Sequence, residues 1–327
     1  MTAMENGVLE NQFPAKTFGL DRASIAVLVP CYNEALTIGD VVTSFRAALP
    51  DARIYVYDNN STDGTSEVAA AAGAIVRHET RRGKGNVVRR MFADVEADAF
   101  VIVDGDATYE AAKAPEMIQK LLDDDLDFVN GARHSTAAEA YRPGHRFGNW
   151  LLTSIVRTIF GRHFTDMLSG YKVLSRRFVK SFPAMSSGFE TETEIAVHAL
   201  ELRMPCCEIM TAYSERPEGS VSKLRTYSDG YRILMLILRL VKDERPFQFF
   251  GLIGLCAVLA AFLISIPLIT TYIETGLVPR LPTAVLSVGL VILGMLSFSV
   301  GLILQMITRT RQELKRLLYL SVLKSAP

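Results

Sequence analysis

Along the first half of the chain, apolar runs alternate with segments of helical pattern. Residues 24–30 form a continuous, largely β-branched run, which is typical of a strand buried on both faces of a parallel sheet. Further strands are expected at 53–58, 74–78, 99–103 and 127–131. After the first strand, apolar residues recur at helical spacing, with Thr37 as a candidate N-cap: Ile38, Val41, Val42 and Phe45. Strands that alternate with helices predict an α/β fold with a mostly parallel sheet.

Two uncharged stretches in the C-terminal part are long enough to cross a bilayer. No Asp, Glu, Lys or Arg occurs at 246–273 or at 281–308, and each stretch exceeds the roughly 20 apolar residues that a span requires. A pair of buried core helices is the alternative, but uncharged runs of this length are rare in soluble domains. We predict transmembrane helices at about 248–273 and 282–307, joined as a hairpin because 274–280 is too short to hold a domain.

Charge is balanced over the whole chain but not along it. The chain has 35 basic and 35 acidic residues; six basic and two acidic residues follow position 245, so that part carries +4 and the rest carries −4. Basic residues flank the two spans on one side: Arg239, Lys242, Arg245, Arg309, Arg311, Lys315 and Arg316. The positive-inside rule makes this side cytoplasmic. A slightly acidic N-terminal part also argues against a nucleic-acid-binding protein.

The chain therefore divides into five expected parts. They are an N-terminal extension (1–23), an α/β domain (24–225), an interfacial helix (226–245), the hairpin (246–308) and a basic cytoplasmic tail (309–327). The extension has no apolar core, so we expect no cleavable signal peptide. In 226–245 a basic stripe lies on an apolar helix, which is typical of a helix in the headgroup plane; a core helix is the alternative. The four cysteines show no metal or redox spacing.

Two aspartates follow the fourth strand directly and are candidate metal ligands. Asp104 and Asp106 leave an apolar run for a loop, and two carboxylates two residues apart can hold one divalent cation. Mg²⁺ and Mn²⁺ prefer such hard oxygen ligands and keep coordination positions for substrate phosphates. The pattern is short, and a solvated acidic turn is its ordinary alternative. Context from the other strand ends is therefore needed.

Polar motifs at the ends of the first two strands supply that context. Residues 30–34 read Pro-Cys-Tyr-Asn-Glu, and 58–65 read Asp-Asn-Asn-Ser-Thr-Asp-Gly-Thr. With the Asp-x-Asp after the fourth strand, they resemble the nucleotide-binding half of family 2 inverting glycosyltransferases, which have the GT-A fold. A Rossmann dehydrogenase or P-loop enzyme would need GxGxxG or GxxxxGK[ST] after the first strand, and neither is present.

The resemblance implies a donor site at these motifs. Pro30, Tyr32, Asn33 and Glu34 would line the nucleotide pocket, with Gly105 nearby. Asp58 would accept hydrogen bonds from the base, and Lys84 would approach the donor or lie on the surface. Asp104 and Asp106 would hold Mg²⁺ or Mn²⁺ against the donor diphosphate. Close relatives have glutamine where this chain has Thr108, whose weaker hydroxyl ligand makes a metal role doubtful.

The second half of the domain narrows the acceptor. Residues 165–177 and 213–223 resemble motifs of the dolichol-phosphate mannose synthase group and related bacterial polyprenyl-phosphate glycosyltransferases. In that group, arginines gather near the lipid phosphate or the donor diphosphate, which guanidinium groups bind bidentately. The matching acceptor- or phosphate-binding candidates are Arg133, Arg146, Arg216, Ser222 and Lys223. The resemblance implies transfer of a sugar from a UDP- or GDP-sugar to a polyprenyl phosphate, with inversion, at the cytoplasmic membrane.

The expected mechanism needs no strong general base. The nucleophile is a phosphate monoester whose second pKa is roughly 6, so it is largely ionised at neutral pH. Asp166 is a tentative catalytic residue that would orient the acceptor, and capping a turn is its alternative. Glu190, Glu192 and Glu194 begin a helix, where acidic residues oppose the helix dipole.

Two other functions remain open from the sequence. One is a membrane glycosyltransferase that acts on a diacylglycerol, ceramide or polysaccharide, although the QxxRW motif of processive synthases is absent. The other is a non-catalytic adaptor that binds nucleotide sugar or lipid. The sugar and the base are not fixed. Glycines in the spans permit close helix packing, with which a homo-oligomer is compatible: Gly251, Gly254, Gly289 and Gly294.

Overall fold

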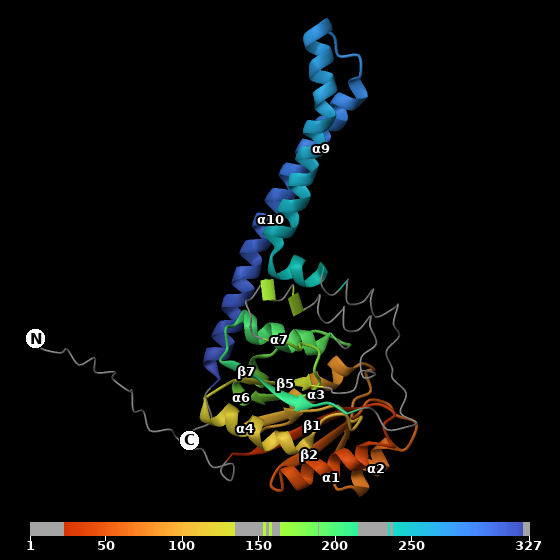
Figure 1. Ribbon diagram of the computed structural model, residues 1–327, viewed down its shortest axis with the longest axis vertical. Coiled ribbons are helices and arrows are strands. Elements are labelled where there is room, and N and C mark those ends of the chain that lie inside the picture. The colour runs from red at the N-terminus through yellow and green to blue at the C-terminus, as the bar shows by residue number, and fades with distance from the viewer. Residues whose placement is uncertain are drawn as a thin grey trace, which may run out of the picture.

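Helices cover both faces of a seven-stranded sheet, and a long helical hairpin projects from one side of this layered domain (Figure 1). The computed structural model describes residues 23–134, 153–154, 157–158, 164–188, 190–214, 235 and 238–322. The strand order is β3-β2-β1-β4-β6-β5-β7. Every pairing is parallel except those that β6 makes with β4 and β5. The predicted α/β fold with a mostly parallel sheet is confirmed.

Each of the five strands expected from the sequence begins within one residue of its expected start. The strands are β1 (Ile25–Cys31), β2 (Arg53–Asp58), β3 (Ile75–His78), β4 (Ala99–Ile102), β5 (Phe128–His134), β6 (Lys172–Ser175) and β7 (Cys206–Ala212). The domain helices are α1 (Ile38–Ala48), α2 (Thr65–Ala71), α3 (Lys84–Asp94), η2 (Ala111–Lys113), α4 (Ala114–Asp123), α6 (Arg176–Ser181) and α7 (Thr191–Glu201). The hairpin consists of α9 (Pro246–Thr275) and α10 (Leu281–Ser321).

Two hydrophobic cores lie on the two faces of the sheet. Every residue of β1 is buried, as the unbroken apolar run predicted, and alternate residues enter opposite cores. Leu28 packs toward α3, α6 and α7, whereas Val27 and Val29 pack toward α1, α2 and α4. The α7 face is the one from which the hairpin rises (Figure 1).

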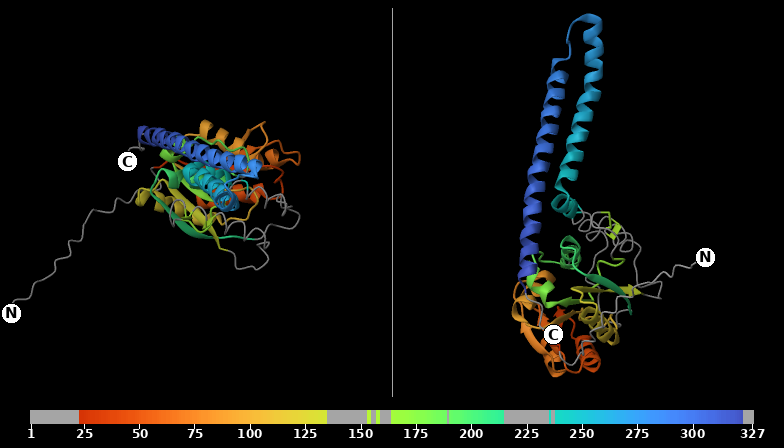
Figure 2. Two further views of the ribbon diagram at one scale, coloured as in Figure 1. Left: turned by 90° about the horizontal axis from the view of Figure 1, so that it is seen from above. Right: turned by 90° about the vertical axis from the view of Figure 1, so that its left-hand side faces the viewer.

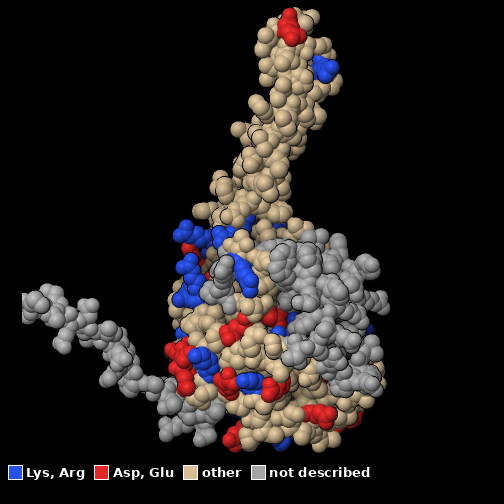
Figure 3. All heavy atoms as spheres, in the orientation of Figure 1, with Lys and Arg blue, Asp and Glu red and all other residues tan. Residues whose placement is uncertain are grey.

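The hairpin is apolar and largely uncovered by the rest of the chain. Only 11% of the most apolar window of α9 is buried, and 17% of that of α10, so neither is the core helix of a soluble domain. Helices of 30 and 41 residues extend roughly 45 and 60 Å, more than a bilayer core of about 30 Å requires. Charged side chains gather at its tip and base but not between (Figure 3). This arrangement indicates insertion into a membrane.

Glycines bring the two hairpin helices together within one chain. A Cβ on Gly254 would lie 2.8 Å from the carbonyl oxygen of Gly294, and a Cβ on Gly294 would lie 2.7 Å from Val258. The helices run side by side in both views of Figure 2. Gly289, by contrast, has nothing within 4 Å of its Cβ position. Two of the four glycines noted in the sequence therefore serve packing inside the hairpin.

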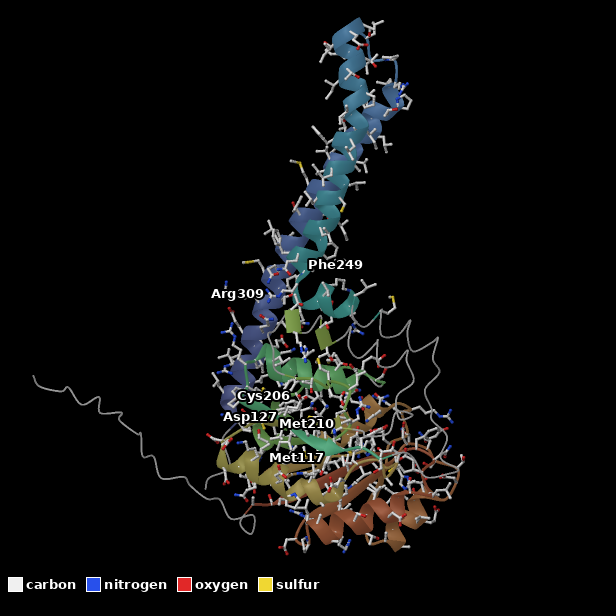
Figure 4. All side chains as sticks on the ribbon, in the orientation of Figure 1. Met117, Asp127, Cys206, Met210, Phe249 and Arg309 are labelled. Atoms are coloured by element: carbon white, nitrogen blue, oxygen red, sulfur yellow. The ribbon has the colours of Figure 1, made fainter. Side chains whose placement is uncertain are left out.

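The helix α10 does not end with the apolar span but continues to Ser321 through the segment expected to be a basic tail. This α10 arm (residues 309–321) lies against the domain (Figure 4, where Asp127 is labelled). The buried Tyr319 donates to Asp127 at 2.6 Å, Arg316 donates to the carbonyl of Leu202 at 2.8 Å, and Lys315 pairs with Glu201 at 2.6 Å. No glycine or proline interrupts the arm, and these contacts hold it on the domain.

Only part of the expected interfacial helix lies among the described residues. Residues 238–244 are helical. Their end is fastened to α10, since Glu244 pairs with Arg311 at 2.8 Å and the carbonyl of Asp243 accepts from Thr308 at 3.2 Å. The segment that leads into α9 is thus fastened to α10 at the base of the hairpin.

Helix α7 connects the α10 arm to the sheet edge and carries a buried histidine. His198 lies edge-on to Phe178 and Phe182, with ring centroids 5.3 Å away in each case. Its Nε2 is 3.3 Å from the hydroxyl of Ser181. Burial, together with the charge of Lys315 on the arm, lowers the pKa of His198 to about 3. The ring is therefore neutral in the folded protein and sensitive to acid.

We expect this histidine to make the domain acid-labile. A pKa of about 3 in the folded chain against about 6.5 unfolded gives stability that is complete above pH 6.5 and is lost as the pH falls toward 3. Between pH 7.5 and 5, wild type should lose about 2 kcal/mol more unfolding free energy than His198→Gln. Denaturant titrations in detergent at both pH values measure this difference. The exposed His134→Gln is the matched control, and parallel loss in wild type and His198→Gln would contradict the assignment.

Candidate functional site

The site lies where the strand order reverses, between the carboxyl ends of β1 and β4. Chain order runs outward from β1 through β2 to β3 and then returns to β4 on the other side, and ligands of open α/β sheets bind at such a switch point. The ladder between these strands ends at Leu28 and Ile102, followed by one hydrogen bond from Val103 to the carbonyl of Leu28. Pro30, which has no backbone N–H to donate, lies just beyond the end of this ladder. Its position therefore removes no hydrogen bond between β1 and β4.

Hydrogen bonds join the loop after β1 to the loop after β2. The Asn33 N–H donates to the hydroxyl of Ser61, the Thr62 N–H donates to the Asn33 side chain, and the Glu34 N–H donates to Thr65, each at 2.9 Å. Asn33 has a left-handed φ of 52°, which asparagine tolerates better than most residues. The two motifs recognised in the sequence therefore form one continuous wall.

Asp58 lies at the base of this wall, and Tyr32 lies on its rim. The buried Asp58 carboxylate accepts from the Ser61 N–H and from the Ser66 hydroxyl, each at 3.0 Å. Tyr32 is 38% exposed, so part of its side chain is accessible to solvent. The roles of both residues toward a base stay predictions.

The loop after β4 holds Asp106 in a fixed orientation. Asp106 is buried, and its Oδ1 accepts the Thr108 hydroxyl at 2.6 Å. The hydroxyl of Thr108 is thus used to orient the carboxylate of Asp106. Thr37 occupies the N-cap position of α1 without a capping side-chain bond; its hydroxyl instead donates to the carbonyl of Gly105 at 2.6 Å. The loop is therefore fixed from both sides.

Two glycines leave room for the carboxylates. A Cβ on Gly170 would collide with the carboxylate of Asp104, and a Cβ on Gly105 would collide with the carboxylate of Glu34. Tyr109 holds Gly170 beside Asp104, because the Tyr109 hydroxyl accepts from the Gly170 N–H at 2.7 Å. The glycine of the 165–177 motif is therefore required for the position of Asp104.

Lys84 lies between two carboxylates at this edge of the sheet. Its Nζ is 2.5 Å from Asp104 Oδ1 and 2.5 Å from Glu192 Oε1. Burial alone would lower the pKa of Lys84, but the charges of Asp104 and Glu192 raise it well above its ordinary value. Lys84 begins α3 and Glu192 lies in the first turn of α7, so both helices of the membrane-side layer contribute to the site.

Arg133 and Asp166 form a bidentate pair at the end of β5. The Nε and one terminal nitrogen of Arg133 donate to the two carboxylate oxygens at 2.6 and 2.8 Å, and the guanidinium lies over the Tyr213 ring. Burial alone would raise the pKa of Asp166, but the hydrogen bonds and charge of Arg133 lower it below its ordinary value. Such a carboxylate is a weak base, so its geometry favours orienting the arginine.

A second buried lysine lies behind these groups. Lys172 Nζ donates to Asn130 at 3.1 Å and to the carbonyl of Ser169 at 2.5 Å. Burial lowers its pKa to about 8, against the opposing charges of Glu192 and Asp166. Lys172 adds positive potential beneath the carboxylates of the site.

The carboxylate pair fits a hard divalent cation. Asp104 and Asp106 offer oxygen ligands on one short loop, the donor type that Mg²⁺ and Mn²⁺ prefer. Within the described ranges, no three or more His, Cys, Asp or Glu side chains gather closely enough to hold a metal by themselves. The remaining coordination positions would fall to substrate oxygens or water, as is usual for Mg²⁺.

Four of the expected phosphate-binding residues lie outside the described residues. They are Arg146, Arg216, Ser222 and Lys223. Ser214, the last described residue before this part of the chain, lies beside Thr108, because its N–H donates to the carbonyl of Thr108 at 2.9 Å. The chain thus reaches the loop that follows Asp104 and Asp106 two residues before Arg216.

Three residues of the site were not identified from the sequence. Glu192 was interpreted as one of several acids that oppose a helix dipole, and its pairing with Lys84 spans 108 positions. Tyr109 and Lys172 carried no pattern of their own. The available signal was their location, since Tyr109 follows the Asp-x-Asp loop and Lys172 lies inside the 165–177 motif.

Comparison with known proteins identifies relatives of this chain. Residues 26–182 match glycosyl transferase family 2. Glycosyltransferase AglJ of Haloferax volcanii is 36% identical over 237 residues, which cover 71% of this chain and 76% of the relative. Dolichyl-phosphate hexose transferase of the same organism is 24% identical over 221 residues, covering 68% of this chain and 95% of the relative.

A solved structure shares the fold of the domain. It is glucosyl-3-phosphoglycerate synthase from Mycobacterium tuberculosis, in complex with Mn²⁺, uridine diphosphate and glucosyl-3-phosphoglycerate. It superposes with a TM-score of 0.56 at 22% sequence identity and covers 68% of this chain and 80% of that chain. The similarity establishes a common GT-A fold.

We expect Gly170→Ala to displace Asp104 and weaken Mn²⁺ binding. The new methyl group would occupy the place of a flexible carboxylate, so the melting temperature should change little while the Mn²⁺ Kd rises roughly tenfold or more. Titration with Mn²⁺ in the presence of a nucleoside diphosphate measures the effect. Gly39→Ala is the matched control, since its Cβ would make an ordinary 3.4 Å contact with Val68. An unchanged Kd in Gly170→Ala would contradict the assigned crowding.

Proposed function

The chain belongs to glycosyl transferase family 2, and from that premise we propose that it transfers a sugar from a UDP- or GDP-sugar to a polyprenyl phosphate, with inversion. One observation carries the proposal. The Asp104–Asp106 loop at the switch point and the Arg133 fork at the end of β5 lie in a domain that is fastened to an apolar hairpin. The site therefore combines groups for a diphosphate with an arginine at the edge of a membrane-anchored domain.

The donor would bind along the wall formed by the β1 and β2 loops. Tyr32, Asn33 and Glu34 would line the nucleotide pocket, with Asp58 accepting from the base. Asp104 and Asp106 would hold Mg²⁺ or Mn²⁺, which supplies charge neutralisation of the leaving diphosphate when bound. Lys84 would donate to the same diphosphate.

The acceptor would enter from the membrane side. By the positive-inside rule, the basic residues at the base of the hairpin support a cytoplasmic location for the domain and the α10 arm. Glu274 and Arg280, at the tip, would lie on the other side. Arg133 would bind the lipid phosphate, and we extend the same role to the phosphate-binding candidates named above that fall outside the described residues. The dolichyl-phosphate relative supports a lipid phosphate acceptor.

The chemistry would depend on orientation and charge. A lipid phosphate oxygen is already ionised at neutral pH, so Asp166 need not remove a proton. Asp166 would instead orient the guanidinium of Arg133, which would hold the lipid phosphate in line with the anomeric carbon of the sugar. Attack from the face opposite the leaving diphosphate inverts the configuration at that carbon.

We expect the purified chain to release nucleoside diphosphate only when a polyprenyl phosphate and Mg²⁺ or Mn²⁺ are both present. Asp106→Ala should lower kcat/KM by about a hundredfold or more, since it removes one of two metal ligands. Asp123→Ala, which alters an exposed carboxylate on α4, should leave the rate unchanged. Release with diacylglycerol or ceramide but not with polyprenyl phosphate would contradict the proposed acceptor.

For Asp166→Asn we expect a KM effect on the lipid. Loss of the charge that orients Arg133 should raise KM for polyprenyl phosphate about tenfold, with kcat within a few-fold and an unchanged pH profile. Asp94→Asn is the matched control, because Asp94 also pairs with arginines but lies at the far end of α3. A kcat reduced a thousandfold with loss of the acidic limb of the pH–rate profile would instead make Asp166 a general base.

A further inference from the structure

The ammonium group of Lys84 occupies the space next to one of the two proposed metal ligands. It lies 2.5 Å from Asp104 Oδ1, and the lysine side chain is only 11% exposed. A divalent cation bound to the same carboxylate would carry two charges within a few ångströms of this ammonium. Two positive groups at that separation repel each other strongly where water is scarce.

The backbone beneath Lys84 is fixed, so only the side chain can respond. Gly83 and Gly85 approach the carbonyls of Ser187 and Ser186 so closely that a Cβ on either would collide with them. The Gly83 N–H also donates to Asn59 at 2.7 Å. The lysine stem above this fixed turn has four rotatable carbons, which allow its ammonium to move by rotamer changes alone.

Glu192 gives the ammonium a second anchor at the same site. Its carboxylate lies 2.5 Å from Lys84 Nζ and is 13% exposed. An ammonium that leaves Asp104 can therefore keep one carboxylate partner while it turns toward a new anion. The donor diphosphate would be such an anion, since it enters beside Asp104 and α3 begins at Lys84, with its N–H groups toward this edge.

Resting on the proposed function, we propose that Lys84 is the resident counter-ion of the donor-free site. It pairs with both Asp104 and Glu192 until a metal-bound nucleoside diphosphate enters, and then moves from Asp104 to the diphosphate. Glu192 is the positioning residue that keeps Lys84 within reach of both. Lys84 thereby opposes binding of the metal alone and favours joint binding of metal and diphosphate, a coupling between two ligands.

The test is Mn²⁺ binding without any nucleotide, followed by the electron paramagnetic resonance signal of free Mn²⁺ in detergent. Lys84→Met keeps the apolar stem but removes the charge, so Mn²⁺ alone should bind at least about tenfold more tightly than to wild type. In the same variant, the Kd for UDP or GDP with saturating Mn²⁺ should rise. Lys113→Met, which alters a half-buried lysine paired only with Glu116 in the described structure, should change neither constant.

Opposite shifts of the two constants support the proposal. An Mn²⁺ Kd that is unchanged or weaker in Lys84→Met would overturn it and leave Lys84 as an ordinary donor-binding residue. Lys84→Gln, which retains a hydrogen-bond donor, gives the same comparison if the methionine variant does not fold. Wild-type Mn²⁺ affinity in Asp106→Ala would show that the ion binds elsewhere, and that result would overturn the proposed function together with this inference.

Discussion

Asp104 and Asp106 place two negative charges side by side at the end of a buried strand. Without partners they would repel each other, and burial would make that repulsion costly. The neighbouring structure compensates for these charges: the Thr108 hydroxyl is directed to Asp106, and the ammonium of Lys84 lies on Asp104. Gly170 leaves the space in which the Asp104 carboxylate stands. The carboxylates are thus partly compensated and oriented before any substrate enters, which lowers the reorganisation needed for catalysis.

Helix α7 joins this edge of the sheet to the membrane anchor. Its first turn brings Glu192 to Lys84, and its last residue, Glu201, pairs with Lys315 of the α10 arm at 2.6 Å. Eleven residues of helix, roughly 16 Å, therefore separate the site from the base of the hairpin. The buried contact of Tyr319 with Asp127 fastens the same arm to the start of β5. The domain is held at a fixed height and orientation below the spans, as a substrate confined to the headgroup plane would require.

The periodicity of the sequence was sufficient for the first five strands and for the two apolar helices, but not for the last two strands, β6 and β7. Each of these elements is defined by local apolar pattern, so its position depends little on the rest of the chain. The antiparallel β6 was not predicted, because its four residues are too few for a reliable alternation and its burial comes from β4 and β5. The segment after residue 308 was expected to be a basic tail. Its run of charged residues does not reveal that Lys315 pairs with Glu201 of α7 or that Arg316 donates to Leu202, the C-cap of α7.

The site was predictable where its residues follow strands and not where they meet through tertiary packing. Asp104 and Asp106 are adjacent to β4 in sequence, and the loop motifs at 30–34 and 58–65 end neighbouring strands. Glu192 reaches Lys84 only because α3 and α7 lie on the same face of the sheet. Asp166 was expected to orient the acceptor, and its bidentate contact with Arg133 could not be predicted because the two residues are 33 positions apart.

The most direct measurement of the central claim is anomalous scattering from crystals grown with Mn²⁺ and UDP or GDP. The account predicts one manganese peak within coordination distance of an oxygen of Asp104, an oxygen of Asp106 and the nucleotide diphosphate. A nucleotide bound in the crevice with no manganese between these carboxylates and its phosphates would contradict it.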